Sequence, residues 1–275
     1  MNNVQLLNTI GLSRKVVNNS IQTDDDKNYD ISKPCYIRVW VHYLDKVRPN
    51  TVKMTFEDAQ KTLIQKLVDD FKFDYIYKNA LLDGKSKNKN IEGYKKILKY
   101  CDDCKDDKTF KSLLLYGAES WGTGKTHTIN AIANKWFLNP KTQITINDFN
   151  DLIIEYTGIS YHQIREEDLL LKITNSYRNK ENAENELEIF EFLNNYDVLA
   201  IDDIGKYQPP NIEFYRRVMF QIIDTRYNQG KGIILSTNFK KTDLFKLLGM
   251  AIIDRLDEMT KEYQIEFKGE SNRAK

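Results

Sequence analysis

The stretch LLLYGAESWGTGKTHT, residues 113–128, constrains the fold of this 275-residue chain more than any other. Its apolar start predicts a short buried strand, and HTINAIANKWF after it predicts a helix. A glycine-rich turn that leads into a helix N-terminus suits an anion, because backbone N–H groups and the positive end of the helix dipole face it there. The stretch therefore predicts a phosphate-binding loop, with an ordinary strand-to-helix turn carrying a surface lysine as the alternative.

The loop is longer than the usual pattern G-x-x-x-x-G-K-S/T. That pattern has a glycine five residues before Gly124, where this chain has Glu119, and the nearest upstream glycine, Gly117, lies two positions earlier. The insert includes Trp121, which would either stack on a base or a partner, or pack over the lengthened loop. The spacing leaves the loop geometry open, while the position between strand and helix still predicts phosphate binding.

The residue types in GTGKT match the groups that a bound nucleotide requires. Glycines let backbone N–H groups close around the phosphates, Lys125 would contact the β and γ phosphates, and the Thr126 hydroxyl would bind Mg²⁺. We include His127, although its expected role is packing on the first helix. The nucleotide-binding residues predicted for the loop are Gly117, Gly122, Thr123, Gly124, Lys125, Thr126 and His127.

A second apolar run, YDVLAIDDIG at residues 196–205, ends in two carboxylates. On a parallel strand near the loop, Asp202 would hold Mg²⁺ through water and Asp203 would polarise the attacking water. A strand that ends in a solvated acidic turn is the alternative for a lone pair of aspartates. A third strand, GIILSTN, ends in Asn238, which would reach the γ-phosphate or the water; asparagine is also a common turn residue at strand ends.

From residue 113 onward, short apolar runs alternate with helical patterns, which predicts an α/β fold with a parallel sheet flanked by helices. The predicted strands are Leu113–Tyr116, Gln143–Ile146, Val198–Ile201 and Gly232–Ser236. Apolar residues at helical spacing predict one helix through Phe149, Leu152, Ile153 and Tyr156, and another through Phe214, Val218, Met219, Ile222 and Ile223 before Gly230.

Residues 1–70 predict a small accessory domain ahead of a main domain at 71–275. The run CYIRVWVHYL, residues 35–44, is β-rich, and TFEDAQKTLIQKLVDDF after it predicts a helix. Thr55 would cap that helix, with Asp58 three residues later. The apolar stripe of the helix consists of Ala59, Leu63, Ile64 and Leu67.

Composition excludes several classes of protein. With 41 Lys and Arg against 40 Asp and Glu, no global field attracts the chain to nucleic acid or membrane. No apolar run reaches the roughly 18 residues of a membrane span and the N-terminus lacks a signal-peptide pattern, so we expect a cytoplasmic protein. Cys101 and Cys104 supply half of a zinc-ribbon spacing, but structural zinc needs four ligands, so reduced thiols are expected. His162, in the polar segment TGISYHQIREEDLL, is expected on the surface.

The motifs in this order, GTGKTH, IDDIG, IIDTRYNQGKGIILSTN, IIDRLDEM and GESNR, resemble the AAA+ ATPases of the DnaC/DnaI helicase-loader group and the similar IstB transposition ATPases. The resemblance covers roughly residues 71–275. It implies a P-loop AAA+ fold that binds and hydrolyses ATP with Mg²⁺. The second acid is Asp203 where many AAA+ proteins have glutamate, a substitution that this group tolerates.

The resemblance also implies roles for two arginines that would otherwise be read as solvated charges. An arginine finger stabilises charge on the γ-phosphate of a neighbouring subunit, so self-association with ATP is implied. The matched positions are Lys125 and Thr126 in Walker A, Asp202 and Asp203 in Walker B, Asn238 as sensor 1, Arg255 as the arginine finger, and Arg273 as the C-terminal sensor arginine.

Three functions remain open from the sequence. The first is an ATP-switched loader in DNA replication that places a hexameric replicative helicase on single-stranded DNA, with residues 1–70 binding the helicase. The second is an IstB-type transposition regulator that assembles on duplex DNA. The third is a non-catalytic module that nucleotide merely locks in one conformation. Binding to single-stranded DNA follows from the resemblance and not from the charge of the chain.

Overall fold

The chain divides into two compact units in the computed structural model. The small unit consists of residues 1–74 and 135–158, and the large unit of residues 75–134 and 159–275. The division into 1–70 and 71–275 stays a prediction. The structure describes residues 16–17, 20–22, 28–30, 34–41, 43–44, 50–71, 80–82, 91–106, 110–117, 122–138, 140, 142–146, 152–178, 185–206 and 211–268.

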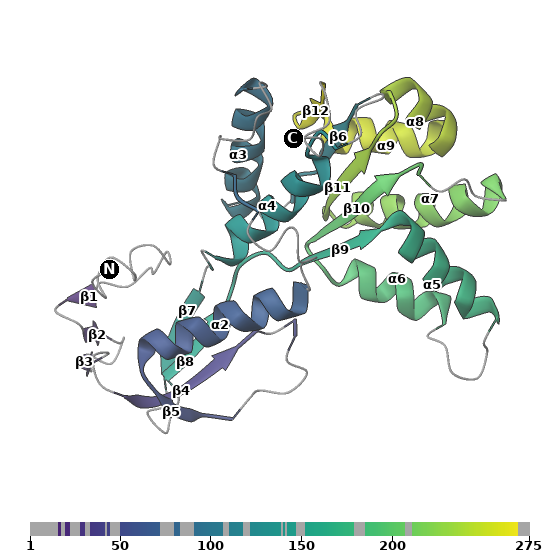
Figure 1. Ribbon diagram of the computed structural model, residues 1–275. Coiled ribbons are helices and arrows are strands. Elements are labelled where there is room, and N and C mark those ends of the chain that lie inside the picture. Colours follow the sequence, from purple (N-terminus) through teal and green to yellow (C-terminus); the bar gives the residue numbers. More distant parts are fainter. Residues whose placement is uncertain are drawn as a thin grey trace. The chain divides into compact units, whose positions relative to one another are not determined.

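The large unit is built on a five-stranded sheet in which every pair of neighbouring strands is parallel (Figure 1). The strand order is β12 (Gln264–Glu266), β6 (Leu113–Tyr116), β11 (Gly232–Thr237), β10 (Val198–Ile204) and β9 (Tyr161–Arg165). The α/β fold with a parallel sheet, predicted from the sequence, is confirmed. Because β11 lies between β6 and β10, the carboxyl ends of the three motif-bearing strands meet at one edge of the sheet.

Helices flank this sheet (Figure 1). Their bounds are α3 (Ile91–Asp106), α4 (Lys125–Phe137), α5 (Glu166–Arg178), α6 (Glu186–Asn194), α7 (Ile212–Asn228), α8 (Lys241–Leu248) and α9 (Met250–Thr260). None of the helices in the described part of the chain has the length and apolar character needed to span a bilayer.

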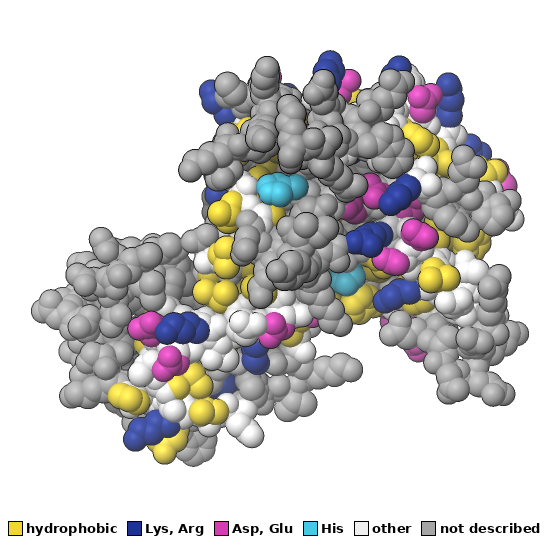
Figure 2. Space-filling model, in the orientation of Figure 1, with side chains coloured by type: hydrophobic (Ala, Val, Ile, Leu, Met, Phe, Trp, Pro, Cys, Tyr) yellow, Lys and Arg dark blue, Asp and Glu magenta, His cyan; other side chains and the backbone are white. Residues whose placement is uncertain are grey.

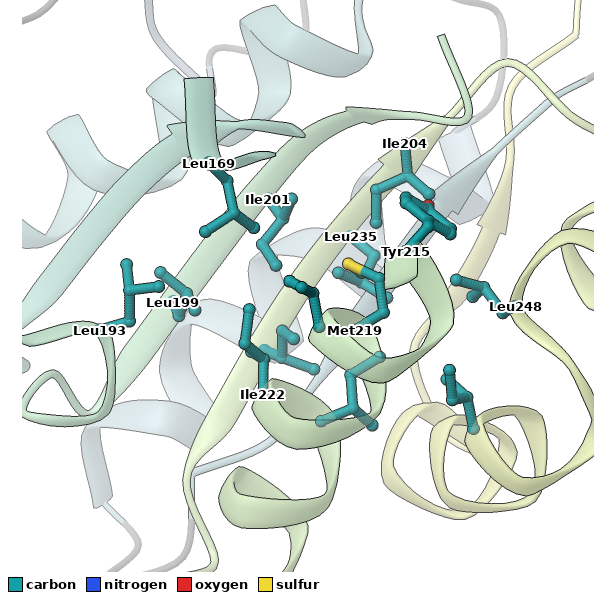
Figure 3. Packing of buried hydrophobic residues seen from close by; sticks show 14 of the residues in the cluster. Leu169, Leu193, Leu199, Ile201, Ile204, Tyr215, Met219, Ile222, Leu235 and Leu248 are labelled. Carbon is teal, nitrogen blue, oxygen red and sulfur yellow. The ribbon is translucent and has the colours of Figure 1, made fainter. Parts of the chain in front are cut away.

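The helix α7 contributes a stripe of buried apolar side chains to this core, as the helical spacing of its apolar residues predicts. Met219 and Ile222 are fully buried against Leu235 of β11, together with Leu199 and Ile201 of β10 (Figure 3). Side chains of α5, α6, α8 and α9 complete the same cluster. Burial of this apolar surface, at roughly 25 cal/mol per Å², fixes the register of β10 and β11 and therefore the position of the polar residues at their ends.

One charged side chain lies inside this core. Arg226, near the end of α7, is completely buried, and its guanidinium donates hydrogen bonds of 2.7–3.0 Å to the carbonyl oxygens of Leu193, Tyr196, Asp197 and Gly232. These carbonyls come from the end of α6 and the starts of β10 and β11. Arg226 therefore joins three elements at the end of the sheet opposite to the motifs.

The small unit contains a four-stranded sheet packed on one helix (Figure 1). Its order is β5 (Val52–Met54), β4 (Cys35–Trp40), β8 (Leu152–Tyr156) and β7 (Thr142–Ile146), and the helix is α2 (Phe56–Phe71). Only β4 and β8 are parallel neighbours. A separate antiparallel ribbon consists of β1 (Val16–Val17), β2 (Ser20–Gln22) and β3 (Asn28–Asp30).

Two sequence predictions for residues 143–156 are wrong. The segment Gln143–Ile146 is a strand, but it pairs antiparallel with β8 in the small unit instead of joining the parallel sheet. The segment that contains Leu152, Ile153 and Tyr156 is the strand β8 instead of a helix, and Phe149 lies outside the described residues. Pairing with β4, more than 100 residues earlier, overrides the local helical spacing here.

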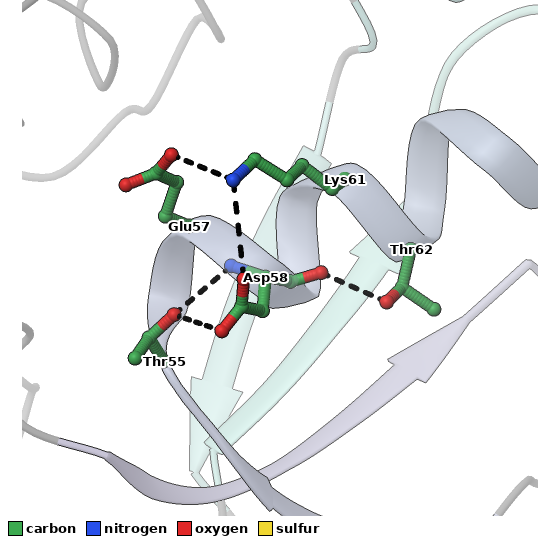
Figure 4. Close-up of polar contacts among 5 residues, drawn as sticks. All are labelled: Thr55, Glu57, Asp58, Lys61 and Thr62. Atoms are coloured by element: carbon green, nitrogen blue, oxygen red, sulfur yellow. Dashed lines mark hydrogen bonds and ion pairs between the residues drawn. The ribbon is translucent and has the colours of Figure 1, made fainter.

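The start of α2 agrees with its predicted cap (Figure 4). The Asp58 N–H donates to Thr55 Oγ1 at 3.1 Å, and the Thr55 hydroxyl donates to the Asp58 carboxylate at 2.6 Å. Lys61 adds an ion pair with Glu57 at 2.8 Å. Of the predicted stripe, Ala59, Leu63 and Leu67 are buried and Ile64 is partly buried.

Candidate nucleotide site

The loop between β6 and α4 has the backbone conformation that its glycines allow. Gly122 and Gly124 have φ values of 72° and 103°, in the region that favours glycine. The helix begins at Lys125, and the Thr128 N–H donates to the Gly124 carbonyl at 2.9 Å. Residues 118–121, including Glu119 and Trp121, lie outside the described residues, so the role of the insert stays a question from the sequence.

Lys125 is a buried cation close to two carboxylates. Only 5% of the residue is exposed, and its ammonium lies 3.4 Å from Thr123 Oγ1 and 5.9 Å from the centroid of the Phe267 ring. Burial lowers the pKa of Lys125, while Asp203 and Asp202 oppose that shift. A largely desolvated ammonium next to a turn of backbone N–H groups has the chemistry required to bind a polyanion.

Asp202 connects the end of β10 to the start of α4. It is 2% exposed, accepts a hydrogen bond from the Ser236 hydroxyl, and has the Thr126 hydroxyl as a second donor. Desolvation by burial raises the pKa of Asp202 and so does Asp203, whereas Ser236 and Thr126 lower it. A carboxylate and a hydroxyl in contact are oxygen ligands of the kind that Mg²⁺ uses, so these residues fit the predicted ion.

Asp203 differs from Asp202 in its backbone conformation and in the exposure of its side chain. Its φ is 62°, the single positive value among non-glycine residues in the described segments. Its N–H donates to Ser236 Oγ at 2.9 Å, and its carboxylate pairs with Lys206 at 3.4 Å. The side chain is 28% exposed. Asp202 therefore lies buried, whereas Asp203 presents a partly exposed carboxylate from a strained backbone of the sort found at functional sites.

The third motif strand brings Asn238 to the same edge of the sheet. Asn238 directly follows β11 and is partly exposed. The adjacent Thr237 hydroxyl donates to the Ile204 carbonyl at 2.7 Å, and Thr237 Oγ1 accepts the Phe239 N–H at 3.1 Å. The turn after β11 is thus tied to the turn after β10.

The two predicted arginines are placed differently from the loop residues. Arg255, on α9, donates to Asp224 of α7 at 2.5 Å, and its guanidinium lies 4.9 Å from the Phe220 ring centroid. Its described contacts are with α7 and α9 and not with the loop. Arg273 lies outside the described residues, and His127 is partly exposed in the first turn of α4.

Sequence reasoning missed two buried polar residues and one strand. Ser236 bridges both aspartates; Glu166, only 1% exposed, accepts the Gly205 N–H at 3.0 Å and the Tyr215 hydroxyl at 2.5 Å. Glu166 follows β9, whose residues YHQIR alternate too weakly to predict a strand. The small polar residue within the apolar run GIILST was the one available signal for Ser236.

His162, which was expected on the surface, is only partly exposed. It lies on β9, stacks on Tyr196 with ring centroids 5.0 Å apart, and meets Phe192 edge-on at 5.1 Å. Burial lowers the pKa of His162 to about 4, with a smaller contribution from Lys172.

The predicted thiols are both buried. In the described part of the chain neither Cys101 nor Cys104 forms a disulfide, and burial raises the pKa of Cys104 to about 11. Within the described ranges, no three His, Cys, Asp or Glu side chains group as metal ligands.

Comparison with known proteins gives relatives in DNA replication. No family model matches the chain. The replicative helicase loader DnaC of Escherichia coli K12 is 27% identical over 135 residues, which are 49% of this chain and 46% of that protein. The chain thus spans about half the length of the curated relatives it matches.

Two solved structures share the fold. A crystal structure of the DnaC helicase loader matches with a TM-score of 0.53 and 22% identity over 71% of this chain and all of that one. The replication initiator DnaA, bound to AMPPCP and single-stranded DNA, matches with a TM-score of 0.50 and 17% identity over 71% of this chain and 52% of that one. The chain therefore shares the fold of these structures, a parallel sheet flanked by helices.

Over the matched half of its length the chain is similar in sequence to the DnaC helicase loaders, the group that its motif order resembles.

Proposed function

We propose that the chain binds and hydrolyses ATP at the carboxyl ends of the neighbouring strands β6, β11 and β10. The observation that carries this proposal is the contact of Thr126 with Asp202 beside the buried Lys125. These three side chains come from two separate strand ends and combine a phosphate-binding cation with oxygen ligands for Mg²⁺. AMPPCP, an ATP analogue, is bound in the DnaA structure of the same fold.

Each residue has a distinct role in the proposed reaction. Lys125 and the N–H groups of the loop neutralise the β and γ phosphates, and Thr126 and Asp202 hold Mg²⁺. The ion, when bound, offsets charge on the phosphates. Asp203 orients and polarises the attacking water, and Asn238 holds that water or the γ-phosphate. The Lys206 ammonium must yield part of its contact with Asp203 for this role.

Binding and turnover of ATP test this site in three variants. We expect Lys125→Ala to weaken binding of a fluorescent ATP analogue at least about 100-fold, since it removes the buried phosphate-binding charge. Asp203→Asn should bind ATP with nearly unchanged affinity and lose at least about 100-fold in turnover, as for a lost general base. Lys135→Ala, on the same helix, is the control. Equal ATP affinity of Lys125→Ala and Lys135→Ala would exclude the site.

We further propose that the protein acts in DNA replication as an ATP-switched loader of a hexameric replicative helicase onto single-stranded DNA. The curated relative is named a replicative helicase loader, and the DnaA of the shared fold is bound to single-stranded DNA. The small unit would bind the helicase. An IstB-type transposition regulator is not favoured, because the matched curated relatives are named as DnaC helicase loaders and a DnaA replication initiator.

Capture of the host's replicative helicase tests this role. Immobilised protein should retain the helicase, and addition of ATP and single-stranded DNA should change the retained amount. The Asp203→Asn variant, which is expected to hold ATP unhydrolysed, should keep the ATP-bound behaviour. Filament formation on duplex DNA without helicase binding would favour the transposition regulator instead.

Electrostatics bears on how DNA would be bound. On the face drawn in Figure 2, described Lys and Arg side chains are interspersed with Asp and Glu and form no extended basic patch. We therefore propose that DNA binding depends on assembly with ATP, in which Arg255 completes the site of a neighbouring copy, and not on the field of a single chain.

A further inference from the structure

A single hydroxyl group on β11 connects both aspartates of the candidate site. Ser236 is fully buried, and its hydroxyl donates to the Asp202 carboxylate while its oxygen accepts the Asp203 N–H at 2.9 Å. A serine hydroxyl has one hydrogen to donate and lone pairs to accept, so one side chain satisfies both groups. Ser236 thus contacts the side chain of one acid and the backbone of the other.

The Asp203 N–H needs this acceptor because the strand ladder is interrupted beside it. The register of β10 against β11 is regular from Val198 to Ile201 and shifts between Ile201 and Ile204. Asp203 lies in this irregular stretch with a φ of 62°. A left-handed conformation costs a non-glycine residue roughly 1–2 kcal/mol and persists only where its surroundings hold it. Two consecutive side chains of β11 hold the stretch, since Thr237 binds the Ile204 carbonyl.

We infer that Ser236 is a positioning residue for ATP hydrolysis, which holds the Asp203 backbone in its left-handed conformation and keeps the Asp202 carboxylate turned toward Thr126. The inference rests on the proposed ATPase function and names the group that sets its geometry. Ser236 lies on β11, two residues before Asn238, which directly follows that strand. The strand that leads into the third motif therefore also fixes the two acids of the second.

The chain contains a matched control at the other end of β10. The Ser160 hydroxyl donates to the Asp197 carboxylate at 2.7 Å, and its oxygen accepts the Asp197 N–H at 2.9 Å. Ser160 is 3% exposed, and Asp197 directly precedes β10. Each serine thus donates to a carboxylate and accepts a backbone N–H near one end of β10, Ser236 with two residues and Ser160 with one, and only Ser236 lies at the candidate site.

The test compares Ser236→Ala with Ser160→Ala in the full chain. Both variants should lower the melting temperature. Only Ser236→Ala should reduce kcat, by at least about tenfold, because displacing a water-orienting acid slows the reaction far more than binding. Its affinity for ATP without Mg²⁺ should stay within about threefold of wild type, since Lys125 and the loop are unchanged. Ser236→Cys, with a similar volume and a weaker donor and acceptor, replaces the alanine variant if that one does not fold.

Amide hydrogen exchange separates this inference from the proposed ATPase function. Removal of the acceptor should raise exchange of the Asp203 amide at least about tenfold in Ser236→Ala and leave the Asp197 amide unchanged, with the reverse in Ser160→Ala. A wild-type protein without Mg²⁺-dependent turnover refutes the ATPase function; the Asp203 exchange then decides alone whether Ser236 holds that backbone. Equal kcat in the two serine variants of an active enzyme, or unchanged Asp203 exchange, overturns the inference.

Discussion

Replacement of the buried Arg226 by methionine should destabilise the large unit more than any surface change on the same helix. Arg226→Met removes the guanidinium but keeps a long apolar side chain in its place. Four carbonyl oxygens, of Leu193, Tyr196, Asp197 and Gly232, then lose a charged donor inside the core. The end of α6 and the starts of β10 and β11 would lose the side chain that joins all three, although the Gly232 N–H still donates to the Asp197 carbonyl at 2.9 Å.

The magnitude follows from these hydrogen bonds. At about 1 kcal/mol for each of the four carbonyls that loses its hydrogen bond from the guanidinium, the loss is about 4 kcal/mol. Burial lowers the pKa of Arg226 to about 10, which reflects the cost of desolvating its charge, and methionine avoids that cost. We therefore expect a net loss of about 3 kcal/mol, or roughly 6–12 °C in melting temperature for a unit of this size.

Thermal unfolding of the variant beside a control measures this loss. Arg217, also on α7, is half exposed and pairs with Glu186 at 2.8 Å, so Arg217→Met should cost at most about 1 kcal/mol. Circular dichroism at 222 nm and a urea titration give both values. A loss in Arg226→Met no greater than in Arg217→Met would refute the reasoning, because it would mean that the four carbonyls find other donors at no cost.

Two further predictions concern Arg255 and His162. Arg255→Ala should bind ATP normally and lose the turnover that depends on assembly, measured as the rise of specific activity with protein concentration; normal turnover would exclude a role in a neighbouring site. The folded pKa of His162, about 4, lies below its unfolded value of about 6.5, so the unfolded state takes up its proton first as the pH falls. The stability that the neutral His162 contributes should be lost as the pH falls from 6.5 to 4, and His162→Phe should flatten that part of the urea-midpoint profile. An equal slope of the urea midpoint against pH in the wild type and in His162→Phe would contradict this assignment.

The parts of the fold that were predictable from sequence are those with local signals. The apolar runs that became β6, β10 and β11 are bounded by turn residues, and the stripe of α7 repeats at helical spacing. The strand β8 could not be predicted, because Leu152, Ile153 and Tyr156 match a helical spacing and only pairing with β4 makes them a strand. β9 was missed because its residues YHQIR show no clear alternation of apolar and polar side chains.

In the candidate site too, some residues have a local sequence signal and others do not. The positions of Lys125, Asp202 and Asp203 follow from strand ends and short motifs, which are properties of neighbouring residues. Ser236 and Glu166 act through hydrogen bonds to residues 33–49 positions away in the chain, and no local pattern specifies such pairs. The inserted loop residues and Arg273 remain predictions from sequence, since they lie outside the described residues.

The small unit is made from two separate parts of the chain, and this limits how the protein can be divided. Ile37 of β4 pairs with Leu152 of β8, so the sheet cannot close until the ribosome has made the phosphate loop and α4. A fragment that ends near residue 70 would leave one edge of β4 unpaired, and an unpaired strand edge promotes aggregation. Deletion of residues 1–70 would remove β4, the partner strand of β8, and nearly all of α2, and would leave β7 and β8 without them. The small unit therefore cannot be removed by one truncation. To obtain the large unit alone, residues 135–158 must also be deleted and replaced by a short linker.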